Sequence, residues 1–267
     1  MSAVTICTDS SALLTASLAA SLGVEIVPIA VALDGEPFDE LTSSLDWFYE
    51  RMRAGAQATT SQPSVGEFAA VYERAVQRGA ESIVSIHLDA RISGTVSSAE
   101  SAVSAVEVPV HVVDTRTVSY GVGLCVRAAA AEVAARGRAG DAGRAASRLG
   151  AVLQNAFVVR GGPGGRIAPD EGWTLFRYQH GAASRISVCA SLMEAVPALV
   201  ALALDDGVPI CVAIGHAGRE IEPAADELAR RLRASGQAVG IERYRVGASV
   251  GAHTGADSFG LFWWPAP

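Results

Sequence analysis

The 267-residue sequence contains no lysine, because all 21 of its basic residues are arginine. This composition excludes Schiff-base chemistry and the lysine of a P-loop phosphate site. Charged residues make up only 18% of the chain, aromatic residues only 6%, and the formal net charge is -7. Nucleic acids and anionic lipids repel an acidic surface, so we expect no nucleic-acid partner.

The sequence also has few cysteines and none of them form a Cys-x-x-Cys pair. Cys7, Cys125, Cys189 and Cys211 are widely separated, and each lies in an apolar run. This pattern is typical of small buried side chains and indicates neither a disulfide framework nor a set of metal ligands. We therefore expect no metal and no cofactor.

Long hydrophobic runs are missing as well. The longest apolar stretches have about ten residues, whereas a membrane-spanning helix needs roughly 20. The first residues lack the basic and apolar segments that are typical of a secretory signal. These features predict a cytoplasmic protein without stable membrane insertion.

What is present is a hydrophobic content of 50%, arranged in a regular alternation. Short β-branched runs alternate with longer amphipathic segments, which predicts an α/β fold with largely parallel strands covered by helices. Expected strands span residues 4–7, 24–33, 82–88, 110–114, 157–159, 209–215, 238–246 and 259–263. Expected helices span residues 45–53, 65–78, 95–106, 122–136, 140–154, 192–204 and 223–234.

Two local signals organise this alternation. Ser64 and Glu67 have the spacing of a capping box, which predicts that a helix begins after Ser64. The glycine-rich segment 161–165 is incompatible with the interior of a helix or central strand. We therefore expect an N-terminal α/β domain over residues 1–156 and a C-terminal α/β domain over residues 157–267.

Four loops at the expected strand ends are rich in glycine and hydroxyl side chains. They span residues 8–12, 59–64, 88–100 and 114–123. In open α/β sheets, ligands bind beyond the carboxyl ends of the strands, where the N–H groups of the following helices favour an anion. The pattern predicts a site for a small molecule with an anionic group, although each serine or threonine also suits an ordinary helix N-cap.

Three further residues are candidates in loops or strands. Arg166 follows a glycine pair, and His253 lies in a glycine-rich stretch that predicts a turn. Either side chain also suits a solvated loop position without a role. His87 lies in an expected strand and is predicted to be a core histidine with hydrogen-bonded ring nitrogens.

Taken in order, these segments resemble the DegV family of fatty-acid-binding proteins. In the first half, the resemblance rests on TDSSA, TSQPSVGEF, SIHLDARISGTVSSA and VVDTRTVSYGVG. In the second half, it rests on GGRI, VAIGHAG and VGASVGAHTGADSFG, so that it covers nearly the whole chain. A motif such as SGT is common alone, but TSQPS, SGT and GAHTG in this order are specific.

The resemblance implies a fold, a function and a set of residues. It implies two α/β domains with a long-chain acyl group such as palmitate in a tunnel between them, its carboxylate bound by Thr60 and Ser93. It implies a bacterial lipid-binding protein that is not itself an enzyme, but the acyl-carrying subunit of a two-part fatty acid kinase in lipid metabolism. A separate ATP-binding subunit phosphorylates the carboxylate, and the resemblance associates Arg166 and His253 with this transfer.

The sequence departs from the family pattern in its second half. Relatives carry a longer segment between the strand around Phe157 and the GGRI motif, whereas only residues 160–163 intervene here. Ala256 follows the GAHTG motif, where relatives usually have proline. These departures concern the transfer residues more than the carboxylate site.

Two other functions stay open. One is a stand-alone hydrolase or acyltransferase in which Ser93 is the nucleophile, His253 the base, and Asp9 or Asp114 the orienting acid. The sequence lacks the GxSxG motif that commonly presents such a serine. The other is a module that binds the phosphate of a sugar or nucleotide, for which the missing Walker loop is unfavourable.

Overall fold

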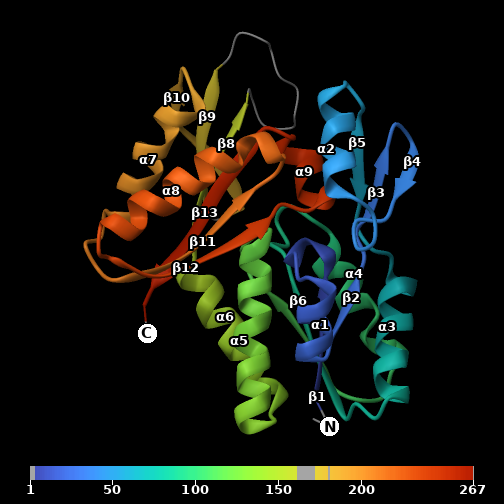
Figure 1. Ribbon diagram of the computed structural model, residues 1–267. Coiled ribbons are helices and arrows are strands. Elements are labelled where there is room, and N and C mark those ends of the chain that lie inside the picture. Colours follow the sequence, from blue (N-terminus) through green and yellow to red (C-terminus); the bar gives the residue numbers. More distant parts are fainter. Residues whose placement is uncertain (1–3, 161–171, 180, 267) are drawn as a thin grey trace. The chain divides into compact units, whose positions relative to one another are not determined.

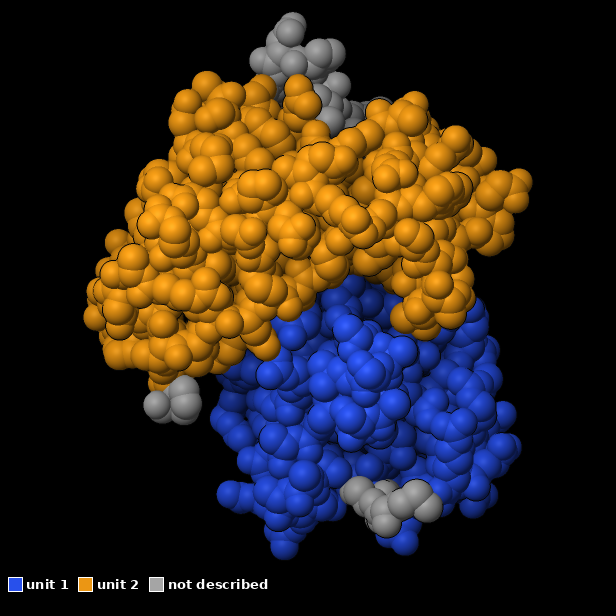
Figure 2. All heavy atoms as spheres, in the orientation of Figure 1, with its two compact units in different colours: residues 1–30, 60–151 blue, residues 31–59, 152–267 orange. Residues whose placement is uncertain are grey.

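The protein forms two compact units, each with its own core (Figure 2). This computed structural model describes residues 4–160, 172–179 and 181–266. Unit 1 comprises Met1–Ala30 and Thr60–Ala151, and unit 2 comprises Val31–Thr59 and Val152–Pro267. The sequence predicted a single boundary after residue 156. The structure differs, because it divides the chain at three points and groups the segment Val31–Thr59 with unit 2.

The segment Val31–Thr59 belongs to unit 2 because its apolar side chains pack there. Phe48 and Tyr49 are buried in one cluster with Val246 and Ala248. The Tyr49 hydroxyl donates to the carbonyl oxygen of Val246 over 2.8 Å. The local pattern of apolar residues predicts which side chains are buried. It does not predict which of the two units buries them.

Unit 1 is built on a four-stranded sheet in the order β2-β1-β6-β7, and all neighbouring strands are parallel, as predicted (Figure 1). Its strands are β1 (Val4–Asp9), β2 (Val24–Val27), β6 (Ser82–His87) and β7 (Val110–Asp114). Its helices are α1 (Ala16–Leu22), α3 (Val65–Gln77), α4 (Thr95–Ser101), α5 (Tyr120–Arg136) and α6 (Ala139–Val152), with short turns η1 (Ser10–Ala12) and η2 (Val103–Ala105).

Helices cover both faces of this sheet. On one face, Phe68 and Tyr72 of α3 and Ala99 of α4 pack with Ile83 of β6. On the other face, α5 contacts β1 and β6. The predicted capping box begins α3, with Ser64 Oγ accepting from Glu67 N and Glu67 Oε2 accepting from Ser64 N. The predicted strand 24–33 is interrupted at Pro28, which has no N–H to donate to a sheet.

Unit 2 contains a six-stranded sheet in the order β10-β9-β8-β13-β11-β12. Its strands are β8 (Gln154–Arg160), β9 (Trp173–Gln179), β10 (Ala182–Cys189), β11 (Ile210–His216), β12 (Ala238–Arg245) and β13 (Ser258–Pro265). Only β11 and β12 pair in parallel among these neighbours, so the largely parallel pairing predicted for the chain holds for unit 1 alone. The chain returns directly from β9 to β10 and inserts β13 between β8 and β11, which imposes antiparallel pairs.

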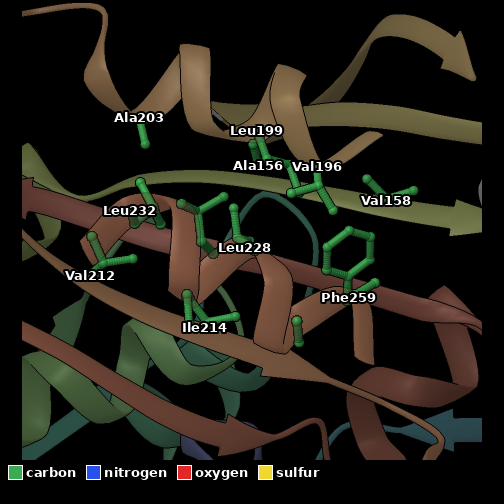
Figure 3. Packing of buried hydrophobic residues seen from close by; sticks show 14 of the residues in the cluster. Ala156, Val158, Val196, Leu199, Ala203, Val212, Ile214, Leu228, Leu232 and Phe259 are labelled. Carbon is green, nitrogen blue, oxygen red and sulfur yellow. The ribbon is translucent and has the colours of Figure 1, made fainter. Parts of the chain in front are cut away.

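Helices α7 (Leu192–Leu204) and α8 (Glu222–Ala234), the latter preceded by η3 (Arg219–Ile221), cover one face of this sheet. Figure 3 shows Val196 and Leu199 of α7 and Leu228 of α8 against Val158 and Ile214 of the strands. Each of these five side chains is fully buried. The core of unit 2 therefore lies between this face and the two helices.

The described residues also form a third, three-stranded sheet in the order β4-β3-β5. Its strands are β3 (Ala30–Leu33), β4 (Glu36–Phe38) and β5 (Ala58–Ser61), and it is accompanied by α2 (Leu45–Arg53) and α9 (Ala248–Thr254). The sequence did not predict α1, α9, β4, β5, β9 or β10. In the described part of the chain, no helix combines the length and the apolar character that crossing a membrane requires.

Candidate functional site

Three of the four hydroxyl-rich loops begin at one edge of the unit 1 sheet. β1 ends at Asp9, β6 at His87 and β7 at Asp114. Because these strands are parallel neighbours, their carboxyl ends meet at the same edge. The first loop continues into η1, whose Ser10 Oγ accepts from Ile29 N over 2.9 Å. Three of the four predicted hydroxyl-rich loops therefore lie at this edge of the sheet.

Ser93 lies in the loop between β6 and α4 and is half-buried. Its Oγ lies 2.8 Å from Thr95 Oγ1 and accepts from Thr95 N over 3.3 Å. This local turn orients the hydroxyl at the start of α4. The start of the loop is also held, because Asp89 is fully buried and accepts two side-chain bonds from Arg91, at 2.9 and 2.6 Å.

Thr60 is half-buried and lies in strand β5. The sequence had predicted a loop at this position. The TSQPS segment reaches the SGT loop through Gln62, whose Nε2 donates to Ser98 Oγ over 3.3 Å. A side chain on Gly94 would overlap the Gln62 amide. The Gln62 amide therefore lies directly against Gly94, and the TSQPS and SGT loops lie side by side. The sequence did not single out Gln62.

The fourth loop is tied to the third through backbone groups. Thr115 Oγ1 donates to the His87 carbonyl oxygen over 2.8 Å. Asp114 Oδ1 accepts from the backbone N–H groups of Arg116 and Ala90, at 2.9 and 3.3 Å. The Asp114 carboxylate thus holds the third and fourth loops together by accepting a backbone hydrogen bond from each.

These contacts weigh against the hydrolase hypothesis. Asp9, like Asp114, already accepts hydrogen bonds within unit 1, in its case from His87 and Ser11. The order Asp9–His87–Ser85 imitates a catalytic triad, but all three side chains are fully buried. Ser85 Oγ also accepts from the Tyr72 hydroxyl, so a substrate cannot reach it without opening the core.

The two residues that the resemblance associates with transfer belong to the second half of the chain. Arg166 lies outside the described residues. His253 is exposed in the last turn of α9, so the predicted turn is in fact part of a helix. The following loop is held by Arg53 of α2, which donates to Asp257 Oδ1 from Nε and Nη2, at 2.9 and 2.8 Å.

The two buried cysteines, Cys7 and Cys125, do not supply a nucleophile to unit 1. Burial raises the pKa of the Cys7 thiol to about 12 and that of Cys125 to about 12. Thiols with such pKa values stay protonated at neutral pH, and the protonated form is unreactive. The prediction that cysteines lie buried is confirmed for these two, whereas Cys189 and Cys211 are half-buried.

Comparison with known proteins gives a consistent result. The family model described as uncharacterised protein, DegV family, matches residues 3–155. A DegV domain-containing protein of Streptomyces coelicolor is 32% identical over 274 residues, which cover 97% of each chain. The match therefore extends through both units.

Two solved structures share the fold. A fatty-acid-binding DegV family protein from Thermus thermophilus has a TM-score of 0.87 and 26% identity, over 98% of this chain and 99% of that one. A protein from Thermotoga maritima with a fatty acid binding function has a TM-score of 0.85 and 24% identity, with the same coverage. On the sequence match and the shared fold together, this chain belongs to the DegV family.

Proposed function

We propose that the protein binds a long-chain fatty acid, whose carboxylate is hydrogen bonded by Thr60 and Ser93. The contact between Gln62 and the SGT loop carries the proposal, because it brings the two hydroxyl-bearing segments together. The fatty-acid binding reported for the two structural relatives supports the choice of ligand.

Neutral hydroxyl donors suit a carboxylate that must be bound and later released. A hydrogen bond from an uncharged donor to a carboxylate contributes about 1.5–3 kcal/mol. A bidentate arginine would hold both oxygens more firmly and leave neither of them free. Two hydroxyls leave lone pairs on the carboxylate accessible to a second reactant.

The acyl chain supplies most of the affinity in this proposal. Burial of a 16-carbon tail offers about 12 kcal/mol before losses, at about 0.8 kcal/mol per methylene. Immobilising the chain and desolvating the carboxylate offset several kcal/mol of this gain. The head group then determines the selectivity among lipids, and the tail determines most of the affinity.

The first test is to identify what the protein carries. We expect protein purified from bacterial cells, then denatured and extracted, to release about one equivalent of long-chain fatty acid by mass spectrometry. Release of a sugar phosphate or nucleotide would support the phosphate-binding alternative instead. An empty protein that hydrolyses esters would favour the hydrolase and contradict the proposal.

The second test addresses the two hydroxyls. The double variant Thr60→Ala/Ser93→Ala should retain less than about a tenth of the acid, because loss of two hydrogen bonds at about 1 kcal/mol or more each exceeds tenfold in affinity. The matched control is Thr59→Ala/Ser97→Ala, which removes an exposed hydroxyl from β5 and another from α4, the helix that follows Ser93. Equal lipid occupancy in the two double variants would count against the head-group assignment.

We further propose a transfer step that requires a separate ATP-binding subunit in the cytoplasm. A carboxylate oxygen attacks the γ-phosphorus of ATP, the bond to the bridging oxygen breaks, and ADP leaves. Arg166 and His253 are proposed to neutralise the developing charge. Arg166→Ala and His253→Ala should abolish acyl-phosphate formation with a cognate kinase while fatty-acid occupancy is unchanged; undiminished transfer would remove these roles.

A further inference from the structure

His87 occupies a central position in unit 1. It is the last residue of β6, between β1 and β7, and is fully buried. Both of its ring nitrogens have partners, since Nδ1 lies 2.9 Å from Asp9 Oδ2 and Nε2 lies 2.6 Å from Ser85 Oγ. The edge of the ring faces Phe68, with 5.0 Å between the ring centres. Packing and hydrogen bonds thus leave the ring a single orientation.

The chemistry of the partners determines where the protons lie. Asp9 is an acceptor, so His87 Nδ1 donates to it. Tyr72 Oη donates to Ser85 Oγ over 2.8 Å, which leaves the serine proton for His87 Nε2. Tyr72, Ser85, His87 and Asp9 therefore form one continuous chain of hydrogen bonds.

This chain of hydrogen bonds, together with the His87 backbone, reaches the first, third and fourth hydroxyl-rich loops and the helix that follows the second. Asp9 Oδ1 also accepts from Ser11 N over 3.1 Å, which holds the first loop. Tyr72 lies on α3, the helix that follows the TSQPS segment. The third loop begins at Leu88, whose N–H donates to Asp9 Oδ2 over 3.4 Å.

The fourth loop is attached to His87 itself. Its carbonyl oxygen accepts both Thr115 N, at 3.0 Å, and Thr115 Oγ1, at 2.8 Å. Removal of the imidazole would leave the buried Asp9 carboxylate and Ser85 hydroxyl each short of a partner. Buried polar groups that lose a partner shift toward other partners, and the loops attached to them shift as well.

We propose that His87 is a positioning residue that sets the preference of the site for a carboxylate over a neutral head group. This inference rests on the fatty-acid function proposed above. Hydrogen bonds to a carboxylate depend steeply on donor position, whereas contact between an alkyl chain and apolar side chains tolerates small shifts. A change at His87 therefore weakens binding of the acid and spares binding of an uncharged lipid with the same tail.

The test compares tetradecanoic acid with tetradecan-1-ol by isothermal titration of delipidated protein. For His87→Leu, we expect the acid affinity to fall by about tenfold or more, with the alcohol affinity changed less than about twofold. His87→Asn retains a donor at the position of Nδ1 and should recover part of the acid preference. His111→Leu is the matched control, because His111 is an exposed histidine on the neighbouring strand β7.

Tyr72→Phe provides a second variant that removes one hydroxyl at the far end of the chain and keeps the ring. We expect a smaller loss of acid affinity, about threefold, with the alcohol again unaffected. Equal losses for acid and alcohol in these variants, or an undiminished acid preference, would overturn the proposed role. A wild-type protein that binds neither lipid would overturn the fatty-acid function itself, which is a distinguishable result.

Discussion

His216 is a second buried histidine, and its surroundings differ from those of His87. It ends β11 and is 5% exposed, with Nδ1 3.5 Å from an Arg243 nitrogen. Arg245 is its partner on β12. Burial together with these guanidinium groups lowers the pKa of His216 to about 4, although Glu222 and Asp226 act in the opposite direction. The folded protein thus holds this ring uncharged, whereas the unfolded chain protonates it near its ordinary pKa of 6.5.

This difference in pKa predicts a loss of stability in weak acid. Below pH 6.5 the histidine is protonated in the unfolded state but not in the folded state. The free energy of unfolding therefore falls as the pH decreases from 6.5 toward 4. We expect His216 to account for a decrease of about 2 kcal/mol in the free energy of unfolding between about pH 7 and about pH 5. Urea unfolding of His216→Asn should show a flatter pH dependence than wild type or His111→Asn. Parallel curves for all three proteins would contradict the assignment.

At the scale of elements, glycines determine how closely α5 and α6 approach the loops of the site. A Cβ on Gly123 of α5 would overlap the carbonyl oxygen of Ala12 in η1. A Cβ on Gly150 of α6 would overlap the carbonyl oxygen of Thr115. Backbone atoms cannot move aside as a flexible side chain can. The two helices therefore support the first and fourth loops through contacts that require glycine.

Gly123→Ala should therefore be costly although alanine favours helices. We expect the free energy of unfolding to fall by about 2 kcal/mol, because the overlap forces α5 away from η1. Gly140→Ala in α6 is the control, since a Cβ there meets only the flexible Arg144 side chain. The control should leave stability unchanged or raise it by up to about 1 kcal/mol. Similar stabilities measured by urea unfolding for the two variants would refute the close contact.

At the scale of the whole molecule, the chain contributes two separate segments to each unit (Figure 2). In unit 2, Arg53 of α2 joins the segment Val31–Thr59 to the later part of the chain. It contacts Asp257, Glu220 and the Ala256 carbonyl oxygen. Arg51 of the same helix has a single exposed ion pair with Asp34. The two arginines therefore differ in what they hold together.

This arrangement predicts that a change at Arg53 loosens one unit only. We expect Arg53→Met to lower the stability of unit 2 by about 1–2 kcal/mol, because it leaves partly buried carboxylate and carbonyl groups without a donor. Hydrogen exchange should quicken for the amides of β11 and β13 and stay unchanged for β1 and β6. Arg51→Met should change neither set. Faster exchange in both units would show that they unfold together.

Much of unit 1 could be predicted from the sequence because its signals are local. The capping box at Ser64 lies within one helical turn, and the apolar runs of the parallel strands are contiguous. The position of the hydroxyl loops at the strand ends follows from the alternation of strands and helices. β10 gave no such signal, because most of its side chains are exposed and no buried face produces an alternating pattern.

α9 shows why other elements escaped prediction. It contains Gly251 and lies between Gly247 and Gly255, and glycine disfavours a helix, so the sequence suggested a turn around His253. A Cβ on Gly251 would overlap the Tyr49 ring, so the glycine is required by packing against a residue some 200 positions away. Tertiary contact therefore overrides local propensity here.

The sequence by itself determined the α/β fold class and the resemblance to the DegV family, because these depend on the order of local motifs. That resemblance implies the proposed roles of Thr60 and Ser93. Only the tertiary structure decided that Val31–Thr59 joins unit 2 and that Gln62 brings the TSQPS and SGT loops together. It also decided that His87 and its partners connect the first, third and fourth loops with α3. Such pairings join residues that are distant along the chain, and hydrogen-bond geometry and close packing select them only once the chain has folded.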